Sequence, residues 1–164
     1  MSVAAHFGEG RRRIGLVSDT HGLLRPEVVA YLSGCEHIIH AGDIGDPAIL
    51  SALAGLAPLT AVRGNNDRGP WAMALPEQVM LEFDGVRIHV LHDLADRGAD
   101  PAYGGAGVVV CGHSHKPEAR PCEGVLVVNP GSAGPRRFRL PIAAGELWIE
   151  GGSVRAALRT FEPN

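Results

Sequence analysis

Residues 14–21 read IGLVSDTH, and this stretch decides how the rest of the chain is interpreted. Its apolar half, residues 14–18, has the length and composition of a buried strand. Polar residues follow at once, so Asp19 and His21 are expected in the loop at the carboxyl end of that strand. In open α/β sheets, ligand sites form in the crevice beyond the carboxyl ends of the strands. The stretch therefore predicts a buried strand with functional residues at its end.

Strands and helices alternate through the first half of the chain. Further strands are predicted at residues 37–40 and 60–63. Helices are predicted at residues 26–32, which open with proline and end before Ser-Gly, and at residues 47–56, with Asp46 as the N-cap. Strand–helix spacing of this kind indicates parallel pairing with right-handed crossovers.

The second half changes to short strands separated by glycine and proline. A hairpin is predicted from residues 78–83 and 86–91, because Asp84-Gly85 suits a type I′ turn. An apolar strand is expected next, at residues 107–111. Antiparallel strands are predicted at residues 118–122, 125–128, 142–144, 146–150 and 154–158. The expected fold class is α/β, with two mixed sheets flanked by helices.

Composition limits the class of protein. The 164 residues suffice for one domain with a core, assigned to residues 14–164, and not for two. Residues 1–13 lack the apolar segment of a secretory signal, so they are expected to be a disordered extension. A net charge of −3 argues against nucleic acid or an anionic membrane as the main partner. No apolar run is long enough to span a bilayer, and three scattered cysteines fit reduced thiols, so a cytoplasmic protein is predicted.

Seven side chains of types that bind metals lie at five predicted strand ends. They are Asp19, His21, Asp43, Asn65, His92, His113 and His115. Carboxylate and amide oxygens combined with imidazole nitrogens suit divalent ions such as Mn²⁺, Fe²⁺ or Zn²⁺. Two such ions close together can hold a phosphate group and activate a water molecule. A single Asp-x-His pair arises easily by chance, whereas the ordered set indicates a two-metal phosphoesterase site.

The order Asp-x-His, Gly-Asp, Gly-Asn-x-Asp, His and Gly-His-x-His resembles that of the calcineurin-like metallophosphoesterase superfamily. The segment Asn129-Pro130-Gly131-Ser132 is similar to the small prokaryotic phosphodiesterase branch of that superfamily. The resemblance extends from residue 14 to about residue 158, nearly the whole chain. It implies a four-layer α/β/β/α sandwich with a dinuclear metal site at the strand ends.

The resemblance also implies how two ions share the ligands. One ion would bind Asp19, His21 and His115, the other would bind Asn65, His92 and His113, and Asp43 would bridge both. A hydroxide bridging the ions would attack phosphorus in line with the leaving oxygen. Mn²⁺ is the expected metal, with Fe²⁺, Zn²⁺, Ni²⁺ and Co²⁺ as alternatives.

Two positions depart from the superfamily pattern. Many members have histidine where this chain has Asn66, and an amide cannot supply a proton to a leaving group near neutral pH. With Asn66 at this position, either turnover favours esters with good leaving groups, or the substrate or solvent supplies the proton to the leaving group. Asp93 follows His92 where glycine is common, and we expect it to cap the next loop rather than to act on the ligands.

Several other candidate residues keep a structural alternative. Asp67 could orient Asn65 or a metal-bound water, or it could form a turn with its own loop. Arg136 and Arg137 could bind substrate phosphate, or they could lie on a solvated loop. His40, inside a predicted strand, is expected to be a buried packing residue or a support for the ligands rather than a ligand.

The sequence therefore predicts a metal-dependent phosphoesterase, acting on phosphodiesters more readily than on monoesters. Its partner would be a small phosphate-ester substrate, and association into a homo-oligomer stays open. One alternative is a protein-binding scaffold on the same fold, like the retromer subunit that resembles this superfamily but has degraded metal ligands. A second alternative is a nuclease, which the acidic net charge disfavours.

Overall fold

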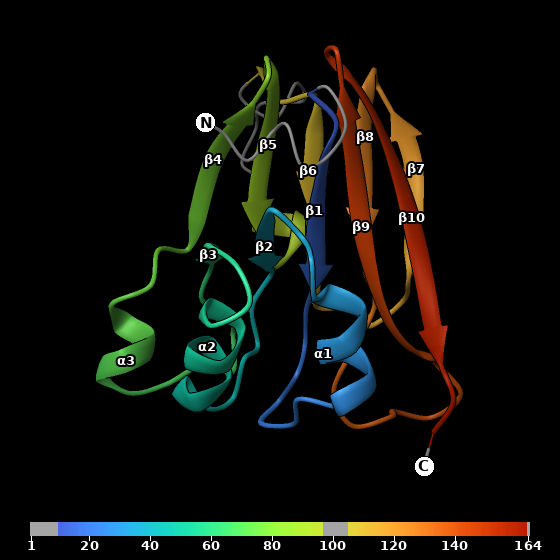
Figure 1. The fold of residues 1–164 in the computed structure, drawn as a ribbon. Helices are drawn as coiled ribbons and strands as arrows, with labels where there is room; N and C mark the ends of the chain where they lie inside the picture. Colours follow the sequence, from blue (N-terminus) through green and yellow to red (C-terminus); the bar gives the residue numbers. More distant parts are fainter. Residues whose placement is uncertain (1–9, 97–104, 164) are drawn as a thin grey trace.

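Two five-stranded sheets pack face to face in the computed structural model, which describes residues 10–96 and 105–163 (Figure 1). The first sheet contains β1 (Arg12–Val17), β2 (His37–His40), β3 (Leu59–Ala61), β9 (Ile142–Glu150) and β10 (Ser153–Phe161), in the order β10-β9-β1-β2-β3. The second contains β4 (Gln78–Phe83), β5 (Val86–Leu91), β6 (Val108–Val110), β7 (Glu118–Cys122) and β8 (Val125–Asn129), in the order β4-β5-β6-β8-β7. The two mixed sheets predicted from the sequence are confirmed.

The first strand begins earlier than its apolar run. Of the expected N-terminal extension, residues 1–9 lie outside the described part of the chain. Arg12 and Arg13 belong to β1, where both pair with residues of β9. The Arg13 guanidinium also donates a 2.6 Å hydrogen bond to the Glu146 carboxylate on β9. Backbone pairing with β9 and this ion pair therefore extend β1 back to Arg12 and Arg13.

The first half of the chain folds as alternating strands and helices. β1 pairs in parallel with β2, and β2 pairs in parallel with β3. The connections contain α1 (Pro26–Leu32) and α2 (Pro47–Ala54). The Asp46 carboxylate accepts a 2.8 Å hydrogen bond from the Ala48 amide and caps α2, as predicted. The parallel pairing of these three strands is thus confirmed.

The second sheet starts with the predicted hairpin of β4 and β5, in which Phe83 lies opposite Val86. Asp84 and Gly85 have positive φ angles of 51° and 84°, as a type I′ turn requires. β5, β6 and β8 are parallel, and β7 is antiparallel to β8. β8 was predicted to be antiparallel to its neighbours, but it is parallel to β6. The reason is that β7 forms the edge of the sheet, and β8 then lies between β7 and β6.

Gly145 does not divide the strand that contains it. The sequence predicted separate strands at residues 142–144 and 146–150, but β9 is continuous. Gly145 lies opposite Leu16 of β1 and Leu158 of β10. A Cβ atom added there would lie 3.1 Å from atoms of β10. Pairing on both sides therefore holds the backbone extended, and glycine permits the close approach of the neighbouring strand.

Aliphatic side chains from both sheets fill the space between them. This core consists of Ile14, Leu16, Ile39, Ala41, Val62, Val86, Ile88, Val90, Val108, Val110, Val128, Leu147 and Ile149. Alternate residues of a strand point to opposite faces, so the intervening residues of the first sheet face outward. There α1 and α2 cover a second cluster that includes Val17, Ile38 and Leu53.

The outer face of the second sheet is covered differently from the four-layer arrangement that the resemblance implies. In residues 10–96 and 105–163, no α-helix packs into the apolar cluster on that face. The 3₁₀ helix η2 (Leu94–Asp96) contributes Leu94 to this cluster, beside Val109 and Val127. Instead α1, α2 and the short α3 (Pro70–Met73) gather at one end of the molecule, the end toward which β1 and β2 point (Figure 1).

The cysteines form no disulfide, as predicted. Cys35 and Cys111 are buried among apolar side chains, and Cys122 is half-buried. Within the described ranges, no helix is long and apolar enough to cross a membrane.

Gly15 provides a test of how α1 packs on the first sheet. A Cβ atom at Gly15 would lie 2.8 Å from Leu32 Cδ2 and 2.9 Å from Cys35 Sγ, both in buried side chains. We predict that Gly15→Val lowers the free energy of unfolding by about 1–3 kcal/mol, because α1 must move outward. Urea denaturation would measure this change. Gly107→Val is the matched control, since its nearest neighbour would be 3.8 Å away; an equal loss in both variants would contradict the prediction.

Candidate metal centre

The seven predicted ligands lie together at strand ends contributed by both sheets. Asp19 and His21 follow β1, Asp43 follows β2, Asn65 follows β3, His92 follows β5, and His113 and His115 follow β6. Five of them form a connected group of carboxylate–imidazole contacts, and the other two, Asn65 and His113, lie beside it. The sheets therefore bring together residues that are up to 96 positions apart (115 − 19).

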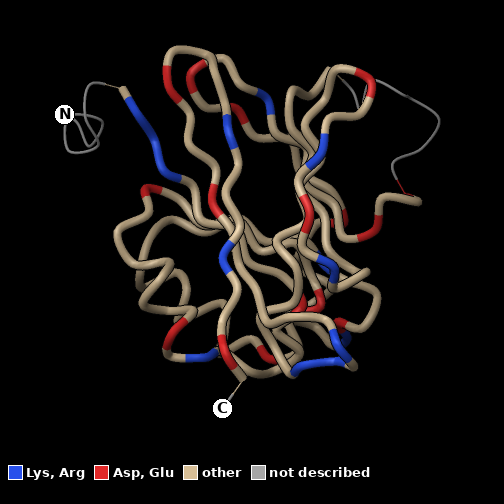
Figure 2. The backbone as a smooth tube through the Cα atoms, turned by 90° about the vertical axis from the view of Figure 1, so that its right-hand side faces the viewer, with Lys and Arg blue, Asp and Glu red and all other residues tan. Residues whose placement is uncertain are grey.

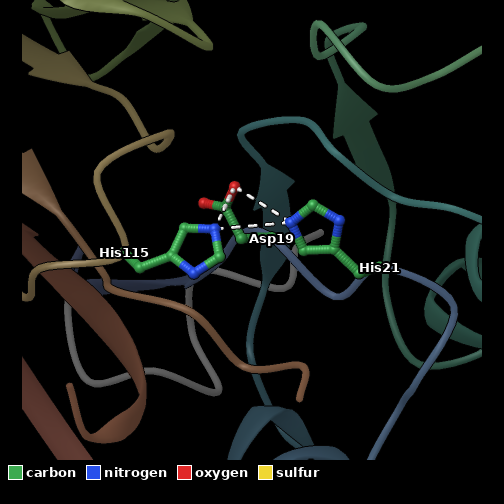
Figure 3. A group of neighbouring side chains, drawn as sticks. All are labelled: Asp19, His21 and His115. Atoms are coloured by element: carbon green, nitrogen blue, oxygen red, sulfur yellow. Dashed lines mark hydrogen bonds and ion pairs between the residues drawn. The ribbon is translucent and has the colours of Figure 1, made fainter. Parts of the chain in front are cut away.

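Asp19 is the most enclosed member of the group, with no exposed surface. Its Oδ1 atom is 3.4 Å from His115 Nε2 and 3.7 Å from His21 Nε2. These two nitrogen atoms are 3.4 Å apart, and Figure 3 shows both facing the carboxylate. The other oxygen, Oδ2, accepts hydrogen bonds from Ser18 Oγ at 2.7 Å and from the His113 amide at 3.1 Å. Protein donors thus hold one oxygen, while the other faces imidazole nitrogens.

Asp43 connects the imidazoles of two different loops. Its Oδ2 atom is 3.3 Å from His92 Nε2 and 3.6 Å from His21 Nε2. Asn66 holds this carboxylate, because its backbone amide donates to Oδ1 and its side-chain Nδ2 donates to Oδ2, both at 2.9 Å. Asp19 also reaches His92, at 3.9 Å. Both carboxylates therefore contact histidines of each implied ligand set, whereas the resemblance gives that position to Asp43 alone.

Asn65 and His113 form the outer side of the group. Asn65 Oδ1 is 3.3 Å from His113 Nδ1, and the His113 ring packs edge-on against His92 with centroids 5.3 Å apart. Asp93 Oδ1 accepts a 3.0 Å hydrogen bond from the Ala95 amide, while its Oδ2 is 3.6 Å from His113 Nε2. Asp93 thus caps its loop and also contacts one of the predicted ligands.

The backbone at this site adopts a conformation that L-residues rarely take. Positive φ angles between 46° and 75° occur at Asp19, His21, Asp43, His113 and His115. Such angles are uncommon outside glycine and persist only where the surrounding structure imposes them. Close contacts between loops supply that constraint: a Cβ at Gly64 would lie 2.2 Å from Asp43, and one at Gly112 would lie 2.1 Å from Ser18 Oγ.

The buried Asp67 carboxylate ties two of these loops together. Its Oδ1 atom accepts hydrogen bonds from the amides of Ile44 at 2.8 Å and Gly45 at 3.0 Å. Its Oδ2 atom accepts one from the Gly64 amide at 2.9 Å. Asp67 therefore joins its own loop to the loop that carries Asp43. Sequence reasoning missed this role because the partner amides are more than 20 positions away.

His40 is a second support of the ligand loops. The Gly42 amide donates to its Nδ1 atom at 3.1 Å, so this nitrogen is unprotonated. Its Nε2 atom lies 3.0 Å from Thr20 Oγ1, whose hydroxyl donates to the Ile44 carbonyl at 2.9 Å. The fully buried imidazole is therefore neutral, with its proton on Nε2, and it links the loops after β1 and β2.

The carboxylates and imidazoles shift one another's pKa values. Burial alone would raise the pKa of Asp19, but contacts with His115 and His21 outweigh it and hold the pKa well below its ordinary value. Burial opposes the same effect at Asp43, where hydrogen bonding, foremost from His92, lowers the pKa to about 2. Burial would lower the pKa of His92, yet Asp43 and Asp19 raise it to about 8. The centre thus keeps its carboxylates charged and attracts positive charge.

Three buried atoms of the centre have no hydrogen-bond partner within the described residues, namely Asp19 Oδ1, His92 Nε2 and His115 Nδ1. His92 Nδ1 donates to the Ala41 carbonyl at 2.7 Å, which leaves Nε2 facing the Asp43 carboxylate. An imidazole lone pair facing a carboxylate requires a proton or a cation between them. The oxygen and nitrogen donors present here therefore fit divalent metal ions.

Two of the cavities that border the centre have arginine side chains in their walls. The larger, of about 460 Å³, lies on the side of His92 and His113. The smaller, of about 220 Å³, lies on the side of His21 and includes Arg136 and Arg137 in its wall. The two arginines are exposed and lie where a phosphate group could approach from that side.

The chain is similar in sequence to a known family and to named relatives. The family model of the calcineurin-like phosphoesterase superfamily domain matches residues 13–150. A protein of Methanothermobacter thermautotrophicus named "Probable metallophosphoesterase" is 36% identical over 163 residues, covering 92% of this chain and 94% of that protein. A protein of Methanocaldococcus jannaschii named a phosphodiesterase is 28% identical over 138 residues, covering 73% of this chain and 82% of that protein.

The fold also matches solved structures at lower identity. A crystal structure of Vps29 from Chaetomium thermophilum aligns with a TM-score of 0.74 and 19% identity, covering 90% of this chain and 98% of that chain. This likeness extends over both sheets and concerns the fold.

The buried His40 leads to a pH-dependent prediction. Burial, opposed by the charge of Asp19, lowers the pKa of His40 from 6.5 to about 4. Between these two pH values, His40 binds a proton in the unfolded chain but not in the folded one. Its contribution to the free energy of unfolding is therefore complete above pH 6.5 and is lost as the pH falls to about 4. That contribution is on the order of 3 kcal/mol.

We predict that the stability advantage of the wild type over His40→Gln shrinks as the pH falls from 7 to 4.5. Glutamine does not titrate, so the variant lacks this dependence. Urea denaturation of both proteins in EDTA would measure the difference without linked metal binding. Parallel stability curves over this pH range would contradict the prediction.

Proposed function

Because the chain belongs to the calcineurin-like phosphoesterase superfamily, we propose that it hydrolyses phosphodiesters with two divalent metal ions at the candidate metal centre. One observation carries this proposal. The buried carboxylates of Asp19 and Asp43 face three imidazole Nε2 atoms at distances of 3.3–3.9 Å. Similarity to a protein named a phosphodiesterase supports the choice of diesters.

The proposed ligand sets follow the order of the motifs along the chain. One ion is assigned to Asp19, His21 and His115, the other to Asn65, His92 and His113, and Asp43 is assigned to both. Groups able to hold a metal occur at Asp19–His21–His115 and at Asp19–Asp43–His92, which is in keeping with two neighbouring ions. Mn²⁺ is the metal we propose to test first, and Fe²⁺, Zn²⁺, Ni²⁺ and Co²⁺ suit the same donors. When bound, two such ions supply the positive charge that makes water reactive and neutralises phosphoryl oxygens.

The chain's own residues prepare the centre for substrate. The bond from His92 Nδ1 to the Ala41 carbonyl fixes the ring so that Nε2 points inward. Asn66 and Asp67 hold the Asp43 carboxylate and its loop in place. These groups are ordered before substrate arrives, so binding need not reorganise them. On the side of the smaller cavity, Arg136 and Arg137 are proposed to contact phosphate oxygens.

Asn66 bears on how the leaving group acquires its proton. Its amide donates to Asp43 at 2.9 Å, and an amide has no proton to give near neutral pH. The leaving alkoxide must therefore be stable by itself or take a proton from substrate or solvent. We propose that turnover falls steeply as the leaving group becomes more basic.

A protein-binding scaffold is the second candidate function. The likeness to Vps29 concerns the fold, whereas all seven side chains of the ligand set are present in this chain. A nuclease is less well supported, because the net charge is −3 and basic and acidic residues are interspersed along the described backbone (Figure 2). Hydrolysis of a small phosphodiester by the metal-loaded protein distinguishes the enzyme from the scaffold.

Asp43→Asn tests the proposed centre. The change keeps the shape of the side chain but removes the charge assigned to both ions. We predict that hydrolysis of bis(p-nitrophenyl) phosphate with Mn²⁺ falls by more than about 100-fold, beyond the usual cost of losing a group that only supports a ligand. Metal content per chain should fall in parallel.

Asp46→Asn is the matched control, since it removes a nearby exposed carboxylate that caps α2 by accepting a hydrogen bond from the Ala48 amide. It should leave the rate unchanged. Wild-type turnover by Asp43→Asn with metal still bound would overturn the assignment.

Asn66→His tests the proposed leaving-group dependence. A series of aryl methyl phosphates with leaving groups of rising pKa would measure it as the slope of log kcat. We predict that histidine makes the slope shallower and raises kcat for the poorest leaving group by up to about 100-fold. Asn66→Ala controls for the lost amide contact with Asp43 and should keep the steep slope. An unchanged slope in Asn66→His would refute the proposed role.

A further inference from the structure

The larger cavity beside the centre has a wall of unusual charge. This cavity, called the acidic cavity below, has a volume of about 460 Å³ and is bordered by Arg63, Asn65, His92, Asp93, Asp96 and His113, among others. Within the described residues, Arg63 is the only arginine or lysine in that wall. Leu91 is the only aliphatic side chain there, again within the described residues.

The single arginine is already neutralised. Arg63 donates a 2.8 Å hydrogen bond to the Glu77 carboxylate, and its side chain is 19% exposed. A second contact joins Arg63 Nη1 to Met73 Sδ at 3.5 Å. Asp93 and Asp96 then leave the remainder of the wall negatively charged. Away from the proposed metal ligands, a phosphate or carboxylate group in this cavity would meet carboxylates rather than an unpaired arginine or lysine.

The acidic cavity adjoins the metal centre through residues that belong to both. The His92 side chain, 5% exposed, lines the cavity, and its Nε2 atom has no hydrogen-bond partner within the described residues. The same atom is 3.3 Å from Asp43 Oδ2. The cavity therefore borders the residues at which the phosphoryl group is proposed to bind.

The other side of the centre has the opposite charge. Arg136 and Arg137 border the smaller cavity, whose wall in the described residues contains no carboxylate. A diester lying across the centre would thus extend one substituent toward carboxylates and the other toward guanidinium groups. Such an asymmetry distinguishes the two ends of a substrate.

We propose that the acidic cavity is the subsite for one ester substituent of the substrate, and that it selects an alcohol bearing an ammonium group. This inference rests on the proposed phosphodiesterase function. Asp96 and Asp93 attract the ammonium group, while the phosphoryl group lies at the metal centre. An anionic substituent is directed to the side of Arg136 and Arg137.

Two chromogenic diesters of equal size test the proposal. In p-nitrophenyl phosphorylcholine the second substituent carries a quaternary ammonium group, and in p-nitrophenyl 3,3-dimethylbutyl phosphate a carbon atom replaces that nitrogen. We expect wild-type kcat/KM with Mn²⁺ to favour the cationic ester by about fivefold or more, chiefly through KM. The ratio should fall as NaCl is raised, because salt screens the attraction.

Charge changes at Asp96 provide the variants, because this residue lies outside the proposed metal ligands. Asp96→Asn should lower the ratio, chiefly by raising KM for the cationic ester, while Asp93 keeps part of the preference. Asp96→Lys should reverse the preference. Asp46→Asn removes a carboxylate outside the acidic cavity and should keep the wild-type ratio.

The two proposals fail in different ways. If metal-loaded wild type hydrolyses neither ester nor bis(p-nitrophenyl) phosphate, the proposed function fails and the subsite fails with it. If it hydrolyses the neutral ester but shows no preference for the cationic one, only the subsite proposal is overturned. A preference that survives in both Asp96→Asn and Asp96→Lys would likewise refute the subsite.

Discussion

Two carboxylates buried at the ends of neighbouring parallel strands are the constraint on which the rest of this structure depends. Asp19 and Asp43 have almost no exposed surface, and an uncompensated buried charge costs several kcal/mol. The surrounding imidazoles and amides reduce that cost by supplying hydrogen bonds and positive charge. Some of the imidazole nitrogens lack hydrogen-bond partners within the described residues. The negative charge of the two carboxylates is therefore neutralised only when protons or metal cations are bound. The demand for a cation is therefore built into the core.

The same constraint extends into the backbone. Side chains from separate strands can point at one place only if the loops after those strands turn sharply, and the left-handed residues of the centre provide these turns. Glycines at 42, 64 and 112 let the loops approach within distances that a Cβ would prevent. Asp67 and His40 then hold the loops through their amides and carbonyls. Rigidity at the site thus results from contacts between loops rather than from any single element.

In the proposed reaction, the metal centre and the two cavities beside it have different roles. The buried group of carboxylates and imidazoles is suited to phosphoryl chemistry in general and says little about which ester is cleaved. Specificity falls to the two cavities, whose charges differ in sign because Asp93 and Asp96 border one and Arg136 and Arg137 border the other. These residues lie on loops and on the short η2 helix at the surface, where changes in charge leave the core intact. One fold can therefore keep its chemistry while its choice of substrate changes.

The sequence by itself determined what depends on neighbours along the chain. Prolines and caps set the start of α1 and α2, Asp84-Gly85 set the hairpin turn, and the ordered motifs identified the family and the ligand types. Only the tertiary structure decided that Asn66 binds Asp43, that β8 lies beside β6, and that the two cavities have opposite charge. Each of these depends on partners that are distant in sequence. Local propensity carries no information about such partners, because sheet order and loop contacts arise only when separate strands pack together.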